Sequence, residues 1–221
     1  MKRAIRLANS VKGEIPVGAL IIKDGEIIAE TFNQKETLNI VGRGECSVTN
    51  GVFRSKGSYA CFGNPEWKNY AVSFKARAPK DAEQVQIWAG FRANNRFDRY
   101  VVGIKGGLQD DLYLMRMGYM GTDEFLGVRP LGFHPVPGQW YKLKVEVCGS
   151  RIRVFVNDEK KPHMDIVDKN SNLAPSGPVT LGGGWIETEF DDLVVTSLEE
   201  NALNDVAVSE YGKVVTPQEK E

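Results

Sequence analysis

Aromatic and arginine side chains recur at short spacings in the middle of the chain, in a combination that suits the recognition of sugar rings. An aromatic ring packs against the C–H face of a sugar, while guanidinium and carboxylate groups bond its hydroxyls. The alternating pattern places Trp88 and Arg92 on the polar-facing side of one expected strand, and Trp185 and Glu187 flank the turn LGGGW. The candidate carbohydrate-binding residues are Trp88, Arg92, Arg99, Tyr113, Arg116, Trp185 and Glu187.

A structural role is the competing interpretation for several of these side chains. Arg92 and Arg116 could each form an ion pair inside the fold, and Trp185 could cap the hydrophobic core. Both interpretations stay open at the level of the sequence.

Two acids close to Trp185 offer a catalytic alternative. Glu187 and Glu189 are two residues apart, and side chains at i and i+2 of a strand share a face. Two carboxyl groups about 5 Å apart are the arrangement of a retaining glycosidase. With Asp192 they repeat the spacing of the Glu-x-Asp-x-x-Glu acids of family-16 glucanases, although the second and third positions hold the other type of acid.

Metal-binding residues are sparse and widely separated. The 3 cysteines, Cys46, Cys61 and Cys148, do not have the spacing of a zinc site, so we expect free thiols, with a Cys46–Cys61 bridge as the alternative in an exported protein. His134 and His163 lie in expected loops. We expect no zinc and no cofactor; the paired acids Asp110-Asp111 and Asp191-Asp192 leave a structural calcium open.

Composition excludes several classes of function. The chain has 221 residues, with 28 basic and 29 acidic side chains and no long basic run, so a nucleic-acid-binding surface is not indicated. No apolar stretch reaches the roughly 20 residues that a membrane helix needs. The N-terminus lacks the continuous apolar core of a signal peptide, and we therefore expect a cytoplasmic protein without membrane contact.

Periodicity divides the chain into three segments. Residues 1–40 predict a short helix and then a hairpin through the Asp24-Gly25 turn. Residues 41–198 alternate apolar and polar side chains over many short strands, most clearly in WYKLKVEVCGSRIRVFVND, where Gly149-Ser150 makes the turn. Strands with one apolar face stack as two sheets, so an all-β sandwich is expected. Residues 199–221 are polar and predict a linker or tail.

The first segment resembles the start of tRNA adenosine deaminases, through GEIPVGALIIKDGEIIAE and FNQKETLN. The family continues with a zinc-binding histidine and a proton-shuttling glutamate. In an ungapped alignment these positions hold Gly44 and Cys46, and Pro-Cys-x-x-Cys is missing. The resemblance therefore implies a truncated segment without deaminase activity.

Residues from about 43 to 198 resemble the concanavalin A-like (laminin-G- and glucanase-type) sandwich modules found beside glycoside hydrolases. The similar pieces are GECSVTNGVFRS, IWAGFRANNRFDRYVVGI, QWYKLKVEVCGSRIRVFVND and TEFDDLVV. The resemblance implies a jelly-roll sandwich, a carbohydrate ligand, a possible catalytic partner domain, and relatives that are often exported. Such modules usually begin with one more strand, so either the hairpin near residues 16–32 replaces it or the sandwich lacks it.

From these observations we expect a carbohydrate-binding or accessory module that binds without turnover. The alternatives are a sandwich-fold glycosidase or sugar-modifying enzyme that uses Glu187 and Glu189, and a structural spacer within a larger hydrolase.

Overall fold

The protein is an all-β structure. A computed structural model describes residues 18–23, 26–32, 39–94, 98–106, 110–118, 122–203, 207–208 and 214–215, with side chains described between residues 40 and 203. Only one helical turn, the 3-10 turn η2 (Ser171–Leu173), occurs among these residues. The helix expected before Gly13 lies outside the described residues, and within them no helix has the length and apolar character to cross a membrane.

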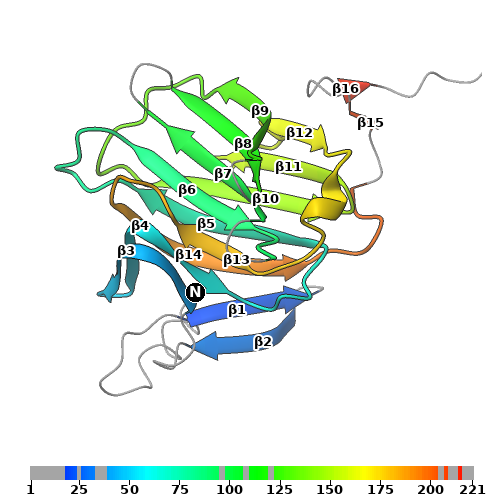
Figure 1. Ribbon diagram of the computed structural model, residues 1–221, viewed down its shortest axis with the longest axis horizontal. Coiled ribbons are helices and arrows are strands. Elements are labelled where there is room, and N and C mark those ends of the chain that lie inside the picture. The colour runs from blue at the N-terminus through cyan, green and yellow to red at the C-terminus, as the bar shows by residue number, and fades with distance from the viewer. Residues whose placement is uncertain are drawn as a thin grey trace, which may run out of the picture.

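Two layers of strands face each other across the core (Figure 1). The strands of the first layer, in spatial order, are β14 (Thr188–Ser197), β5 (Tyr70–Arg77), β10 (Tyr141–Cys148), β11 (Arg151–Val156) and β12 (Met164–Val167). Those of the second layer are β13 (Val179–Gly182), β6 (Gln86–Phe91), β7 (Arg99–Lys105), β8 (Asp111–Met117) and β9 (Glu124–Pro130).

The strand β4 (Val52–Phe62) belongs to both layers. Its first half pairs with β14, through Phe53↔Phe190, and its second half pairs with β13, through Ala60↔Leu181. At the far side β9 and β12 lie next to each other (Figure 1), and His163 Nε2 lies 2.9 Å from the carbonyl oxygen of Pro130. The sheet is therefore nearly closed around the core.

Alternation of side chains builds this core, as the sequence predicts. Each strand sends every second residue inward, and one continuous cluster joins Phe74 and Val145 of the first layer to Ile87 and Leu114 of the second. The hairpin of β10 and β11 forms in the expected register, with Cys148 opposite Arg151 across the Gly149-Ser150 turn. The all-β sandwich fold is thus confirmed.

The Asn50-Gly51 pair makes the tight turn between β3 (Asn39–Thr49) and β4. Both residues have positive φ, 53° and 79°, which is the requirement of the two-residue turn that suits a twisted hairpin. The segment Ile40–Cys46 is part of β3 and pairs with β4.

The N-terminal hairpin adds strands to the first layer. β1 (Gly18–Lys23) and β2 (Glu26–Phe32) pair antiparallel around residues 24–25. β1 also pairs parallel to β14, with Leu20 opposite Val194 (Figure 1, blue strands).

Residues 199–203 pack on the body of the sandwich. The Cys148 thiol lies 2.9 Å from the carbonyl oxygen of Glu200, Arg151 donates to the carbonyl of Leu203, and Leu203 is buried. The short strands β15 (Ala207–Val208) and β16 (Val214–Val215) pair with each other beyond this point.

Candidate functional site

Three strands of the second layer align aromatic side chains on their outer surface. Register places Trp88 opposite Gly103, and Gly103 opposite Tyr113, so the three residues form one row on the face away from the core. The Trp88 and Tyr113 rings meet edge to face, with centroids 6.1 Å apart, and Phe125 of β9 meets the other side of Tyr113 at 6.2 Å. We call the outer surface of β4, β13, β6, β7, β8 and β9 the outer aromatic face.

Two glycines leave room for the side chains on this face. A Cβ atom at Gly103 would lie 2.2 Å from Tyr113 Oη, so the tyrosine ring lies across the backbone where a side chain would otherwise stand. A Cβ atom at Gly90 would lie 2.3 Å from Thr180 Oγ1 and 3.1 Å from Arg99 Cδ. The Tyr113 ring therefore packs down onto the sheet, where it is buried and 6% exposed, and Trp88 packs partly buried against it.

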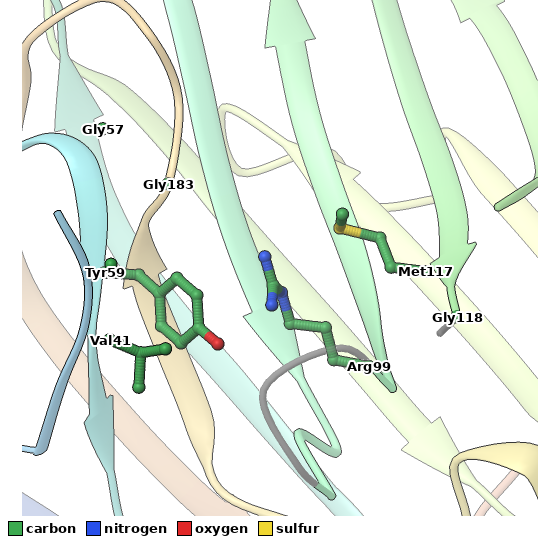
Figure 2. A pocket seen from close by; sticks show the side chains of 8 residues that line it. Val41, Gly57, Tyr59, Arg99, Met117, Gly118 and Gly183 are labelled. Atoms are coloured by element: carbon green, nitrogen blue, oxygen red, sulfur yellow. The ribbon is translucent and has the colours of Figure 1, made fainter. Parts of the chain in front are cut away.

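A hollow of about 210 Å³ opens on the same face (Figure 2). It is lined by Val41, Gly42, Gly57, Tyr59, Arg99, Met117, Gly118 and Gly183. The guanidinium carbon of Arg99 lies 4.2 Å from the centroid of the Tyr59 ring, a cation–π contact. Burial lowers the pKa of Arg99 and the nearby charge of Asp123 opposes that shift, but an arginine remains protonated in proteins. The hollow therefore carries a fixed positive charge beside an aromatic ring.

Trp185 stands at the rim of the outer aromatic face. The backbone N–H groups of Trp185 and Ile186 donate to Gln86 Oε1 at 2.8 Å and 3.1 Å, and Gln86 precedes Trp88 by two residues on β6. The Trp185 side chain is 77% exposed. It does not cap the core, and Glu187 follows it at the same rim, half-buried.

Arg92 does not lie on this face. Its φ of +48° turns the chain after Phe91, and its buried guanidinium donates to the carbonyl oxygens of Lys68 and Gly149 at 2.6–2.8 Å. Arg92 also borders a second hollow, of about 310 Å³, together with Lys68, Asn69, Gly149, Ser171, Asn172, Pro175 and Glu200. None of these described lining residues is aromatic.

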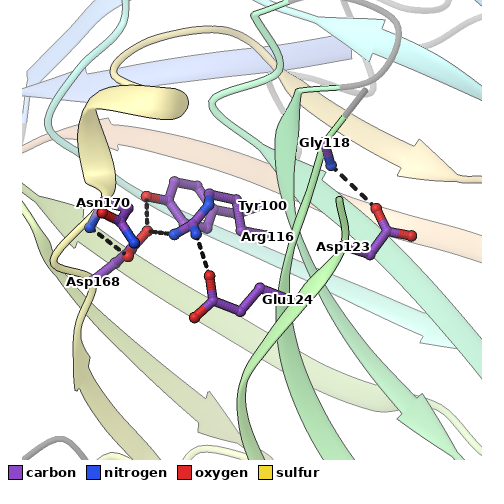
Figure 3. A network of polar contacts seen from close by, with 7 residues as sticks. All are labelled: Tyr100, Arg116, Gly118, Asp123, Glu124, Asp168 and Asn170. Carbon is purple, nitrogen blue, oxygen red and sulfur yellow. Dashed lines mark hydrogen bonds and ion pairs between the residues drawn. The ribbon is translucent and has the colours of Figure 1, made fainter. Parts of the chain in front are cut away.

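Arg116 is likewise apart from the sugar-facing candidates, since it is three residues from Tyr113 and points to the opposite side of β8. It forms ion pairs with Asp168 and Glu124, and Tyr100 Oη donates to Asp168 Oδ2 at 2.7 Å (Figure 3). The expectation that Arg92 and Arg116 join Trp88 and Tyr113 is therefore corrected: the structural interpretation applies to both arginines.

Glu189 belongs to β14 of the opposite layer and is buried, with 3% of the residue exposed. Its two carboxylate oxygens each lie 2.6 Å from an arginine nitrogen, one of Arg54 and one of Arg77. Arg77 in turn stacks on Trp140, with 4.3 Å between its guanidinium carbon and the ring centroid. One member of the Glu187–Glu189 pair thus has both oxygens engaged in ion pairs.

Both histidines, and one member of each acid pair, have local partners. His134 Nδ1 lies 2.9 Å from Asp110 Oδ2, His163 Nδ1 lies 2.9 Å from Glu159 Oε1, and Lys75 Nζ lies 2.6 Å from Asp192 Oδ2. Across the described residues, no group of three or more His, Cys, Asp and Glu side chains is placed to hold a metal ion.

The cysteines are free thiols. Cys46 lies opposite Ser55 and Cys61 lies opposite Asn39 in the β3–β4 pair, so the two sulfur atoms are separated along the strands and the alternative of a Cys46–Cys61 bridge is wrong. Burial raises the pKa of both thiols.

Tyr59, Met117 and the glycines of the hollow are not among the candidates that the sequence indicates. Tyr59 alternates with the inward residue Ala60 in β4, so its outward direction could have been read from period two. Its contact with Arg99, 40 positions later, depends on β13 and β6 lying between β4 and β7, which local patterns do not specify.

No family model and no curated protein matches this chain. Among solved structures, the carbohydrate-binding module CBM66 from Bacillus subtilis is 14% identical, with a TM-score of 0.59 over 73% of this chain and 98% of that module. The GH43 protein BlXynB from Bacillus licheniformis is 10% identical, with a TM-score of 0.47 over 67% of this chain and 33% of that one. A Bacillus subtilis protein of unknown function with a galectin-like fold is 11% identical, with a TM-score of 0.48 over 71% of this chain and 87% of that one.

The likeness to the CBM66 module bears on the fold. The comparisons give no support to the resemblance of residues 1–39 to deaminases. The chain shares its β-sandwich fold with the CBM66 module.

Proposed function

We propose that this protein is a carbohydrate-binding or accessory module of the concanavalin A-like class, acting beside a glycoside hydrolase and binding sugar without turnover. The observation that carries the proposal is the outer aromatic face, where Trp88, Tyr113 and Arg99 lie together on one side of a sheet with Trp185 at its rim. The exposed Trp185 and the half-buried Trp88 supply aromatic surface on which a sugar ring can stack, beside the hollow that Arg99 lines. The CBM66 module from Bacillus subtilis, which shares this fold, is a carbohydrate-binding module. This likeness supports the choice of a carbohydrate as the ligand.

The proposal is tested by measuring the binding of the purified protein to an array of plant and host polysaccharides, followed by calorimetric titration of the hits. We expect Trp88→Ala and Trp185→Ala each to weaken binding by at least about tenfold, roughly 1.4 kcal/mol, because each removes an aromatic surface. Trp185 is 77% exposed, so its truncation leaves the core intact.

Trp140→Ala is the matched control, since Trp140 is a half-exposed tryptophan beside Arg77 on the opposite layer. It should bind as the wild type does. If the protein bound none of the polysaccharides on the array, the result would contradict the proposal and favour a structural spacer. Release of reducing sugar that disappears in Glu189→Gln would instead assign a glycosidase.

A further inference from the structure

We propose that the outer aromatic face binds an internal stretch of a linear polysaccharide laid across strands β6 to β9, and that Phe125 of β9 is a further stacking residue. This inference rests on the proposed carbohydrate-binding function and names the form of ligand that the same site takes.

Exposure of aromatic side chains at both margins of the face is the first argument. Trp185 is 77% exposed and Phe125 is 63% exposed, which makes them the two most exposed large apolar side chains among the described residues. Trp185 lies beside Gln86 of β6 at one margin, and Phe125 belongs to β9 at the other. Both rings are therefore open to a ligand, on opposite sides of one face.

The width of the face sets the size of that ligand. The strands β6, β7, β8 and β9 lie side by side (Figure 1), and neighbouring strands are about 4.8 Å apart, so the three steps from β6 to β9 cover roughly 14 Å. A pyranose ring is similar in size to one aromatic ring and can stack at one margin only. A carbohydrate that contacts both margins must therefore be a chain of several sugar units.

Side chains between the margins keep this path apolar. The half-buried Trp88 contacts the buried Tyr113, and Tyr113 contacts Phe125, with ring centroids 6.1 Å and 6.2 Å apart. Val128 lies opposite Tyr113 in β9 and is 44% exposed. The C–H faces of successive sugar units can therefore rest on one continuous apolar surface.

A polar row runs beside this apolar surface. Register places Gln86 opposite Lys105, and Lys105 opposite Asp111. Each is two residues from a member of the row formed by Trp88, Gly103 and Tyr113, so the two rows share a face. Lys105 is exposed, and Gln86 and Asp111 are partly exposed. Their ammonium, amide and carboxylate groups can bond the hydroxyls along the edge of a chain whose rings lie on the apolar row.

The hollow on this face is too small to enclose the end of a chain. Its volume of about 210 Å³ lies below the roughly 300–1,000 Å³ of pockets that bury a small ligand. Recognition of a chain end needs such an enclosure, whereas an open face accepts sugar units from the middle of a chain. The shape of the face therefore favours an internal stretch.

Chain length provides the first test. Calorimetry measures affinities for cello-oligosaccharides and xylo-oligosaccharides from disaccharide to hexasaccharide, and for a size-fractionated hydrolysate of the polysaccharide that binds most tightly on the array. We expect the hexasaccharide of the preferred series to bind at least about tenfold tighter than the disaccharide, roughly 1.4 kcal/mol, because only the longer chain reaches from Trp88 to Phe125. Titration with the intact polymer should place several protein molecules on each chain.

Variants assign the length dependence to Phe125. Phe125→Ala should weaken hexasaccharide binding by about fivefold, the effect of losing one aromatic contact, and leave disaccharide binding unchanged. Phe125→Tyr keeps the ring and should bind the hexasaccharide as the wild type does. Phe155→Ala is the matched control, since Phe155 is a half-buried phenylalanine beside Lys144 on the opposite layer. Phe125 is 63% exposed, so its truncation leaves the core intact.

Three results would overturn the inference while leaving the proposed function in place. They are equal affinity for disaccharide and hexasaccharide, saturation at one protein molecule per polymer chain, and an unchanged hexasaccharide affinity in Phe125→Ala. If Phe125→Ala also dissociated a dimer in sedimentation velocity, the unchanged affinity would assign Phe125 to contact with a second copy of the chain. Failure to bind any polysaccharide would remove both the inference and the proposed function.

Discussion

Asp168 is the side chain on which several structural contacts converge. Its Oδ2 atom pairs with Arg116 and accepts a hydrogen bond from Tyr100 Oη, and its Oδ1 atom accepts one from the Asn170 N–H at 2.9 Å. Burial by itself would raise the pKa of Asp168, but the bonds from Arg116, Tyr100 and Asn170 outweigh it and hold the pKa below its ordinary value. Tyr100 and Arg116 belong to the second layer and Asp168 follows β12 of the first, so this carboxylate links the two layers.

Removing this carboxylate should destabilise the protein strongly. We expect Asp168→Ala to lower the free energy of unfolding by about 3–5 kcal/mol at pH 7, because it leaves the buried Arg116 without one of its two acidic partners. Urea denaturation measures the change. Because the folded pKa is depressed, the contribution of Asp168 is present above its unfolded pKa of about 3.9 and is lost as the pH falls through the folded value. The difference between wild type and variant should therefore shrink below about pH 4.

Asp158 supplies the control, since its ion pair with Lys142 is exposed. Asp158→Ala should change the free energy of unfolding by no more than about 1 kcal/mol. Equal effects from the two substitutions, or a gap for Asp168→Ala that is independent of pH, would contradict the role given to Asp168.

At the scale of elements, the alternation of side chains between the two faces of a strand decides which candidates share a surface. Tyr113 and Arg116 are three residues apart in β8, so they point to opposite faces. Trp88 and Arg92 are four residues apart, but Arg92 lies beyond the end of β6 with a positive φ. Grouping such residues by closeness in sequence therefore overstates the site, whereas Trp88, Gly103 and Tyr113 come together through register.

Gly103 is an element-level feature at which a substitution should be felt in both stability and binding. In Gly103→Ala the new Cβ atom would lie 2.2 Å from Tyr113 Oη and 2.5 Å from the carbonyl oxygen of Ile87. The Tyr113 ring must then move off the sheet, so we expect a loss of roughly 1–3 kcal/mol in stability together with weaker carbohydrate binding. Thermal unfolding and calorimetric titration measure the two effects.

Gly106 at the end of β7 is a suitable comparison. A Cβ atom there would meet Pro135 and Val85 at 3.4–3.5 Å, which is ordinary contact. Gly106→Ala should change the stability by less than about 1 kcal/mol and leave binding unaltered. Wild-type binding by Gly103→Ala would show that the Tyr113 position does not matter to the ligand.

At the scale of the molecule, the two layers form one unit. β4 pairs with β14 of the first layer and β13 of the second, one core cluster contains residues of both, and β9 lies beside β12. Neither layer can separate without breaking the pairing of β4 and exposing the shared core.

The sandwich should therefore unfold in a single cooperative transition. We expect tryptophan fluorescence, which reports on residues of both layers such as Trp88 and Trp140, to follow the same urea curve as far-ultraviolet circular dichroism. Asp168→Ala should move both curves to lower urea concentration together. Two separated transitions would show that the layers unfold independently.

The sequence by itself determined the local features of this protein. Alternating apolar side chains specified the strands and their buried faces, Gly149-Ser150 specified a hairpin turn, and Trp88, Arg99 and Tyr113 were recognisable as site candidates. These features depend on residues within one strand or turn, so a single pass along the chain reveals them.

Only the tertiary structure decided which of those candidates meet. Pairing of β4 with β13, and of β13 with β6, brings Tyr59 to Arg99, while the approach of β12 to β9 draws Arg116 and Asp168 into the interior. These contacts join strands that are distant in the chain. Their partners are selected by the packing of the whole core and by cross-strand register, which no local spacing of residues encodes.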